Sequence, residues 1–171
     1  MEEQRQISDE EREHEKDKER LKELLISFSV DLVVVAANSL DARNLKKTMD
    51  TVAAEAKTGS SKEAFVIWGG PEVPKLFSMS HNSQRLHKGT PQILKQAISL
   101  CRFEQDPLTE VLNLWSPITA ENQTLALNMD PLQKLVNQVK LAEALEEENI
   151  KMVNDIGLDL NLIVDHEHMH A

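Results

Sequence analysis

The chain has 171 residues, of which 40% are hydrophobic and 4% aromatic, and its formal net charge is −10. These values suit one modest globular domain with an appended segment. The acidic balance and the lack of tyrosine argue against free-standing nucleic-acid binding, which relies on clustered Lys and Arg and on aromatic platforms. No apolar run approaches about 18 residues and the N-terminus is charged, so neither a membrane span nor a secretory signal peptide is predicted.

A charged helix is predicted at the N-terminus, over residues 1–28. Glu, Asp, Lys and Arg dominate its first part, which contains no Gly or Pro, and mixed charges four residues apart support a solvated helix. Four apolar residues at helical spacing then share one face: Leu21, Leu24, Leu25 and Phe28. We expect the first half to be exposed and the last two turns to pack, with a partner-binding arm as the alternative for the charged run.

A strand–helix–strand unit follows this helix. Residues 30–37 are a continuous Val-rich run, typical of a strand buried on both faces, and Ser39 can cap a helix that starts at Leu40. The helix carries an apolar stripe: Leu45, Met49, Val52, Ala53 and Ala56. A second β-rich run, Ala64–Trp68, ends at Gly69-Gly70-Pro71, so the short links predict a right-handed βαβ unit.

A short helix over Val73–Ser80 and a polar loop over His81–Gly89 are predicted next. The following helix, Pro91–Arg102, has an apolar face: Leu94, Ala97, Ile98 and Cys101. Since Cys101 is the single cysteine, no internal disulfide is possible. Its place on an apolar face predicts a buried thiol in a reducing compartment.

Two Asp-Pro-Leu steps come after this helix. Asp106 and Asp130 can accept hydrogen bonds from free amides of the next turn, while Pro107 and Pro131 pre-set φ for a helix. We interpret both steps as structural caps.

The second step is expected to open a long helix. This helix would carry an apolar stripe over residues 132–139 and end at Gly157. A short strand over Thr124–Leu127 is expected before it, in an otherwise irregular segment.

The order and spacing of motifs between Thr90 and Asp165 resemble one family. The motifs are the helix Pro91–Arg102, the step Gln105-Asp106-Pro107-Leu108, the step Asp130-Pro131-Leu132-Gln133 and the segment Val153–Asn161. From Leu21 to its end the chain is similar to the eukaryotic suppressor-of-Ty-six family and to its bacterial relative Tex. The resemblance implies the YqgF-type, RNase H-like region of a larger transcription elongation factor.

The implied fold is α/β: a partial RNase H-like (YqgF-type) fold with a long N-terminal helix and a C-terminal helical extension. Its expected divisions are a charged leading helix (1–28), a YqgF/RNase H-like core (29–115), a helical extension (116–156) and the start of a helix-hairpin-helix region (157–171). The opening three-stranded meander of the fold has no counterpart, and a two-stranded sheet is marginal alone. We therefore expect a fragment, or a sheet edge that another chain covers.

Asp41 is the first candidate catalytic residue, because it follows the carboxyl end of a strand, where α/β sheets place their ligands. RNase H-like nucleases gather several carboxylates there around two metal ions, and Glu104 or Asp106 could join it. However, no acid precedes it on an opening strand, and Asn38 and Ser39 stand where one is needed. We interpret Asp41 as a stabiliser of the first helical turn, and we predict no catalytic, cofactor-binding or metal-binding residue.

Three further patterns fall short of a site. The C-terminal histidines, with an acid between them, place two ligands on one helical face, which is too few for zinc: His166, Glu167, His168 and His170. Gly69-Gly70-Pro71 lacks the Lys-Ser/Thr of a phosphate-binding loop. Cys101 has no sequence context of a catalytic nucleophile.

The resemblance implies a non-catalytic scaffold in a nuclear histone chaperone that travels with RNA polymerase II. Its expected partners are the RNA polymerase II elongation complex and core histones, with nucleic acid reached through the parent protein and no membrane. The faces at Leu21–Phe28 and 132–139 would pack against neighbouring modules. Two alternatives stay open: a YqgF-type nuclease or Holliday-junction resolvase, and a Tex-like nucleic-acid-binding protein.

Overall fold

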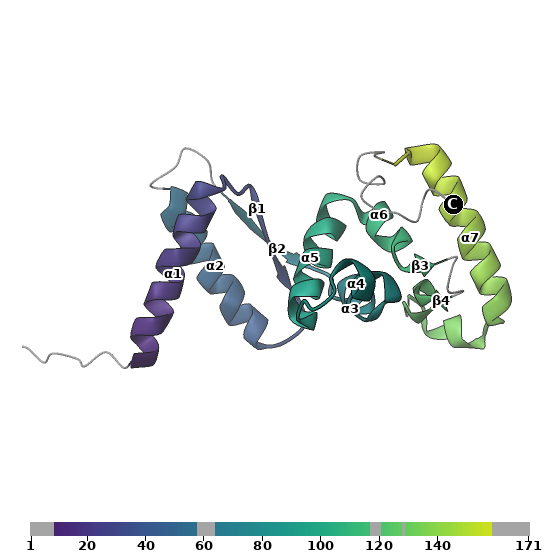
Figure 1. Ribbon diagram of the computed structural model, residues 1–171, viewed down its shortest axis with the longest axis horizontal. Coiled ribbons are helices and arrows are strands. Elements are labelled where there is room, and N and C mark those ends of the chain that lie inside the picture. The colour runs from purple at the N-terminus through teal and green to yellow at the C-terminus, as the bar shows by residue number, and fades with distance from the viewer. Residues whose placement is uncertain (1–8, 58–63, 117–120, 128, 159–171) are drawn as a thin grey trace, which may run out of the picture. The chain divides into compact units, whose positions relative to one another are not determined.

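The computed structural model describes residues 9–57, 64–116, 121–127 and 129–158. They fall into two compact units, residues 1–69 and residues 70–171. The fold is α/β and mostly helical, as predicted, and its larger sheet has two parallel strands (Figure 1).

The first unit is a βαβ unit with an additional N-terminal helix. Its elements are α1 (Asp9–Ser27), β1 (Leu32–Ala36), α2 (Asp41–Lys57) and β2 (Phe65–Gly69). The two strands pair in parallel along their whole length, with Val34 opposite Ile67, which confirms the predicted strand–helix–strand arrangement. Both helices lie to one side of the strands (Figure 1).

Helix α2 forms most of the core of this unit. Its predicted apolar stripe is buried, with Val52 only 1% exposed, except for Leu45, which is 53% exposed. The predicted cap is confirmed, because the Ser39 hydroxyl accepts a hydrogen bond from the amide of Ala42 at 3.2 Å, and the helix begins at Asp41, one residue after the predicted start. Local capping and spacing are therefore enough to define α2.

The end of α1 packs onto this core in part. Leu21 packs against a cluster of three buried residues from β1 and α2: Val35, Ala42 and Met49. Lys22 of α1 also lies 3.7 Å from the Glu55 carboxylate of α2. Phe28, however, lies beyond the helix and is 75% exposed, so the predicted packing of the last two turns is correct for Leu21 and wrong for Phe28.

The prediction that β1 is buried on both faces is wrong for the described part of the chain. Alternate side chains of a strand point to opposite faces, and Val33, Val35 and Val66 belong to the cluster beneath the helices. Leu32 and Phe65 lie on the other face and are exposed. Within this unit, both helices pack on the face that carries Val33, Val35 and Val66.

The second unit is a set of short helices with a small hairpin. It contains α3 (Glu72–Met79), α4 (His81–Leu86), α5 (Gln92–Gln105), α6 (Pro107–Leu112), β3 (Trp115–Ser116), β4 (Glu121–Asn122), the 3-10 turns η1 (Gln123–Ala126) and η2 (Pro131–Leu135), and α7 (Gln138–Ile156). Strands β3 and β4 are antiparallel. The apolar core gathers around Phe77 and Leu114, which are 0% and 1% exposed.

Helix α4 replaces the polar loop predicted over His81–Gly89. The hydroxyl of Ser80 accepts a hydrogen bond from the amide of Ser83 at 3.0 Å and caps this helix. Ser80 was expected to end the preceding helix, and α3 does end one residue earlier, at Met79. One serine therefore separates two helices, where the polar sequence alone indicated a loop.

The region around the second Asp-Pro step differs from the prediction. Residues 124–127 form no strand, since η1 occupies most of them. Asp130 caps only the short turn η2. Helix α7 starts later, at Gln138, and is capped by the Asn137 side chain, which accepts from the amides of Val139 and Lys140 at 3.0 and 3.3 Å. Helix α7 ends at Gly157, whose φ is 84°, as predicted.

The apolar stripe predicted over residues 132–139 is divided between two elements. Val136 has an extended backbone, with φ −82° and ψ 144°, and it separates η2 from α7. Leu132, Leu135 and Val139 are all exposed in the described structure. They do not form one helical face.

Helix α5 buries a different face from the one predicted. Leu94 is 52% exposed and Cys101 is also exposed, which corrects the expectation of a buried thiol. The buried residues are Lys95, Ser99 and Leu100. The physical reason is that Ser99 donates a buried hydrogen bond to Glu110 of α6, which draws this face of α5 inward.

Candidate functional site

The strand end that holds Asp41 carries capping groups. Asp41 is the first residue of α2 and is exposed, and Ser39 is engaged with the amide of Ala42. A carboxylate in a first helical turn interacts favourably with the helix dipole. This arrangement agrees with the interpretation of Asp41 as a helix stabiliser.

The other candidate carboxylates also act locally. Asp106 accepts from the amide of Thr109 at 3.1 Å and from its hydroxyl at 2.6 Å, and so caps α6. Asp130 accepts from the amide of Leu132 at 2.7 Å. Glu104 is half-buried on α5. Within residues 9–57, 64–116, 121–127 and 129–158, no three His, Cys, Asp or Glu residues are grouped so that they could hold a metal ion.

The remaining candidates from the sequence are the Gly69-Gly70 segment and the C-terminal histidines. Gly69 ends β2, and its carbonyl accepts from the amide of Ala37 at 3.0 Å. A Cβ at Gly70 would lie 3.0 Å from a carboxylate oxygen of Glu72, which is the movable end of an exposed side chain. The histidines at 166, 168 and 170 and Glu167 lie outside the described residues.

A buried polar layer joins α4, α5 and α6, and sequence analysis missed it. Ser99 donates its hydroxyl hydrogen to Glu110, the Asn113 amide donates to the same carboxylate at 3.2 Å, and Asn82 donates to the Asn113 carbonyl at 3.0 Å. Glu110 is 1% exposed. Burial raises the pKa of the Glu110 carboxyl, against the opposing influence of Ser99, Asn113 and the Arg102 charge.

Three basic residues accompany this layer: His87, which follows α4, and Lys95 and Arg102 on α5. Burial lowers the pKa of His87, and the charges of Arg102 and Lys95 lower it further. The His87 ring meets Phe77 edge-on, with centroids 6.2 Å apart. The layer thus places neutral and charged polar groups inside a small helical unit. We assign these groups a structural role.

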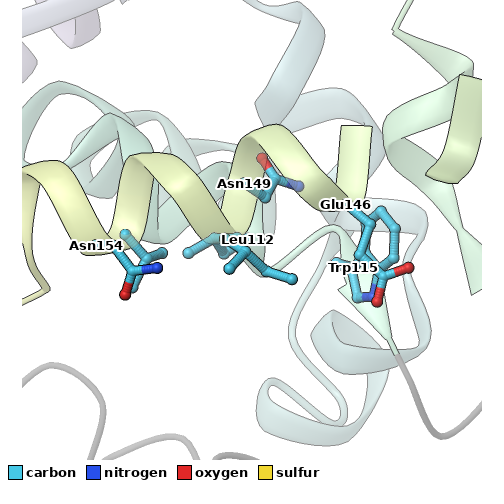
Figure 2. A pocket seen from close by; sticks show the side chains of 7 residues that line it. Leu112, Trp115, Glu146, Asn149 and Asn154 are labelled. Atoms are coloured by element: carbon cyan, nitrogen blue, oxygen red, sulfur yellow. The ribbon is translucent and has the colours of Figure 1, made fainter. Parts of the chain in front are cut away.

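A groove with an apolar lining lies between α6, β3 and α7. Figure 2 shows Leu112 and Trp115 beside α7. The groove has a volume of about 260 Å³, and its α7 wall is lined by Glu146, Asn149, Ile150, Val153 and Asn154. Sequence analysis missed it because the α7 stripe was placed at 132–139.

The class of protein follows from the fold and from a match to a family model. Residues 3–115, which include the parallel βαβ unit and helices α3 to α6, match the family model described as the Holliday-junction resolvase-like YqgF domain of SPT6, so this part of the chain is an RNase H-like domain of the YqgF type.

Comparison with curated proteins gives the family. The chain is 34% identical over 136 residues to transcription elongation factor SPT6 of Drosophila melanogaster, which covers 78% of this chain and 7% of that protein. It is 31% identical over 139 residues to transcription elongation factor SPT6 of Candida albicans, with 77% and 10% covered. It is also 27% identical over 138 residues to the suppressor of Ty 6 homolog of Caenorhabditis briggsae, with 80% and 9% covered. The chain belongs to the SPT6 family, and it spans about a tenth or less of the length of these relatives.

Proposed function

We propose that this chain is a non-catalytic scaffold domain of a nuclear transcription elongation factor and histone chaperone that acts with RNA polymerase II. Membership of the SPT6 family supports this proposal, since the relatives are named as transcription elongation factors. Among the described helices, none is long and apolar enough to cross a membrane.

The observation that carries the non-catalytic part is the carboxyl end of β1. A two-metal nuclease needs clustered carboxylates at this place. Here Asn38 and Ser39 follow the strand, and the Ser39 hydroxyl is used to cap α2. Asp41 is left as one exposed carboxylate in the first turn of a helix.

One observation favours nucleic-acid binding as the second candidate function. Residues 73–103 contain no Asp or Glu although the chain as a whole is acidic. The same segment holds five basic residues: Lys75, Arg85, Lys88, Lys95 and Arg102. Lys95 is buried and Arg102 is half-buried, however, which leaves fewer charges for phosphate contacts on the surface.

The two functions are separated by parallel binding measurements. The chain is titrated with core histones and, separately, with duplex and single-stranded DNA over a range of salt concentrations. Preferential histone binding supports the proposed chaperone role. DNA binding that weakens steeply with salt, and weakens further in Lys88→Glu, supports the second candidate instead. If the chain binds neither histones nor DNA, the result contradicts a histone contact by this domain. The domain would then act only as a scaffold within its parent protein.

A further inference from the structure

The groove between α6, β3 and α7 has an apolar floor and an open mouth. Leu112 and Trp115 face Ile150 and Val153, which recur at helical spacing along α7. Ile150 is 57% exposed, and no described residue of α7 is buried. An apolar cavity of about 150 Å³ accommodates a benzene ring, so a groove of about 260 Å³ has room for a large apolar side chain.

The α7 wall of the groove is acidic at one end. Glu146 lines the groove, and Glu143 lies three residues earlier, on the adjacent turn of the same side. Both side chains are exposed, and within the described residues neither forms an ion pair. Glu146 and Trp115 both line the groove (Figure 2).

Among the described residues, neither lysine of α7 forms an ion pair with Glu143 or Glu146. The helix carries five carboxylates and two lysines. Lys151 lies 3.5 Å from the Glu148 carboxylate, and neither residue lines the groove. An apolar slot beside unpaired carboxylates complements a segment that pairs a large apolar side chain with Lys or Arg.

We propose that this groove binds a basic amphipathic segment of a partner protein. The apolar side chain of that segment occupies the space between Trp115 and Ile150, and its neighbouring Lys or Arg side chains pair with Glu143 and Glu146. Specificity arises from the charge at the rim, while the apolar floor supplies the burial. This inference does not depend on the proposed role with histones.

The test uses the full chain and Trp115 as the reporter. The chain has two tryptophans, so Trp68→Phe leaves Trp115 as the sole source of tryptophan fluorescence. The probe is the synthetic peptide acetyl-Ala-Lys-Leu-Arg-Lys-Ala-amide. Two control peptides replace Leu by Ala, or replace every basic residue by Glu. We expect saturable change of Trp115 emission with the probe only.

Matched variants on α7 locate the binding. Ile150→Gln removes apolar contact inside the groove, and Met152→Gln makes the same change on an exposed residue outside it. We expect Ile150→Gln to weaken binding about tenfold, as the loss of one or two buried methylene contacts implies, and Met152→Gln to have no effect. Glu146→Lys should weaken binding about threefold to fivefold, the range of an exposed ion pair, whereas Glu148→Lys should not.

Three results would overturn the proposal. The first is binding that Ile150→Gln leaves unchanged, and the second is equal binding of the acidic peptide. The third is a groove that is already covered in the free chain. Shielding of Trp115 from acrylamide quenching would show that this chain itself covers the groove, and dimerisation that is lost when Ile150 is changed would show that a second copy does.

Discussion

Glu110 is a carboxyl group in the interior of the second unit, held by the neutral donors Ser99 and Asn113. A buried carboxyl group avoids the cost of desolvating a charge by staying protonated. Its pKa is raised for this reason. The residue therefore links the stability of this unit to pH.

The sign of the linkage follows from the raised pKa. Protonated Glu110 stabilises the folded state fully below its unfolded pKa, near the ordinary value of 4.5, and this stability is lost as pH rises through the folded pKa. Glu110→Gln is neutral at every pH. We expect the free energy of unfolding of Glu110→Gln to equal that of the wild type at low pH. Toward neutral pH it should exceed the wild-type value, by about 1.4 kcal/mol for each unit by which the pKa of Glu110 is raised.

Urea unfolding at several pH values measures this difference. Ser99→Ala serves as a control that removes a donor and leaves the carboxyl group in place. A gap between Glu110→Gln and the wild type that does not change with pH would contradict the assignment.

The two Asp-Pro steps look alike in sequence, but their environments differ. Asp106 is half-buried and makes two hydrogen bonds to Thr109, whereas Asp130 is exposed and caps a short turn. We expect Asp106→Ala to lower the free energy of unfolding by about 1–2 kcal/mol, and Asp130→Ala by about 0.5 kcal/mol or less. Thermal unfolding of the two variants compares them directly, and equal losses would be contrary to this account.

At the scale of elements, the first unit was largely predictable and the second was not. The stripe of α2 has a clear helical periodicity and the two strands are short continuous β-rich runs, so local pattern was sufficient to place these three elements. The buried face of α5 depends on Ser99, whose partner Glu110 lies on another helix. A pattern of apolar residues cannot indicate a burial that a tertiary hydrogen bond creates.

The start of α7 illustrates a second limit. Asp130-Pro131 and Asn137 are both good helix starts, and the sequence does not say which one begins the long helix. The structure uses the first for η2 and the second for α7. The groove on α7 could not be foreseen, because its residues become a wall only when α7 lies beside Trp115.

The two faces of α5 can be distinguished by mutation. Leu100 is 6% exposed and Leu94 is 52% exposed. We expect Leu100→Ala to destabilise the protein by about 2–5 kcal/mol, because it leaves a cavity, and Leu94→Ala by about 0.5 kcal/mol or less. Chemical denaturation provides both values. A larger loss of stability in Leu94→Ala than in Leu100→Ala would mean that α5 buries the face predicted from the sequence.

At the scale of the whole molecule, family membership is firm while the domain boundaries 1–28, 29–115, 116–156 and 157–171 stay predictions. The RNase H-like class of the domain raises the question of nuclease activity, since the same fold supports both catalytic and non-catalytic proteins. Among the described residues, Asp41 opens α2 after the end of β1 and belongs to no group of three or more His, Cys, Asp or Glu residues that could hold a metal ion. We therefore predict that this domain performs no metal-dependent cleavage.

The most direct test incubates the chain with a four-way DNA junction, and with duplex DNA, in the presence of Mg²⁺ and then Mn²⁺. Asp41→Asn is measured in parallel, so that a contaminating nuclease is recognised by its indifference to this change. The account predicts intact DNA at every concentration of the chain and with both metals. Cleavage that requires the metal and disappears in Asp41→Asn would contradict it and would identify an active nuclease.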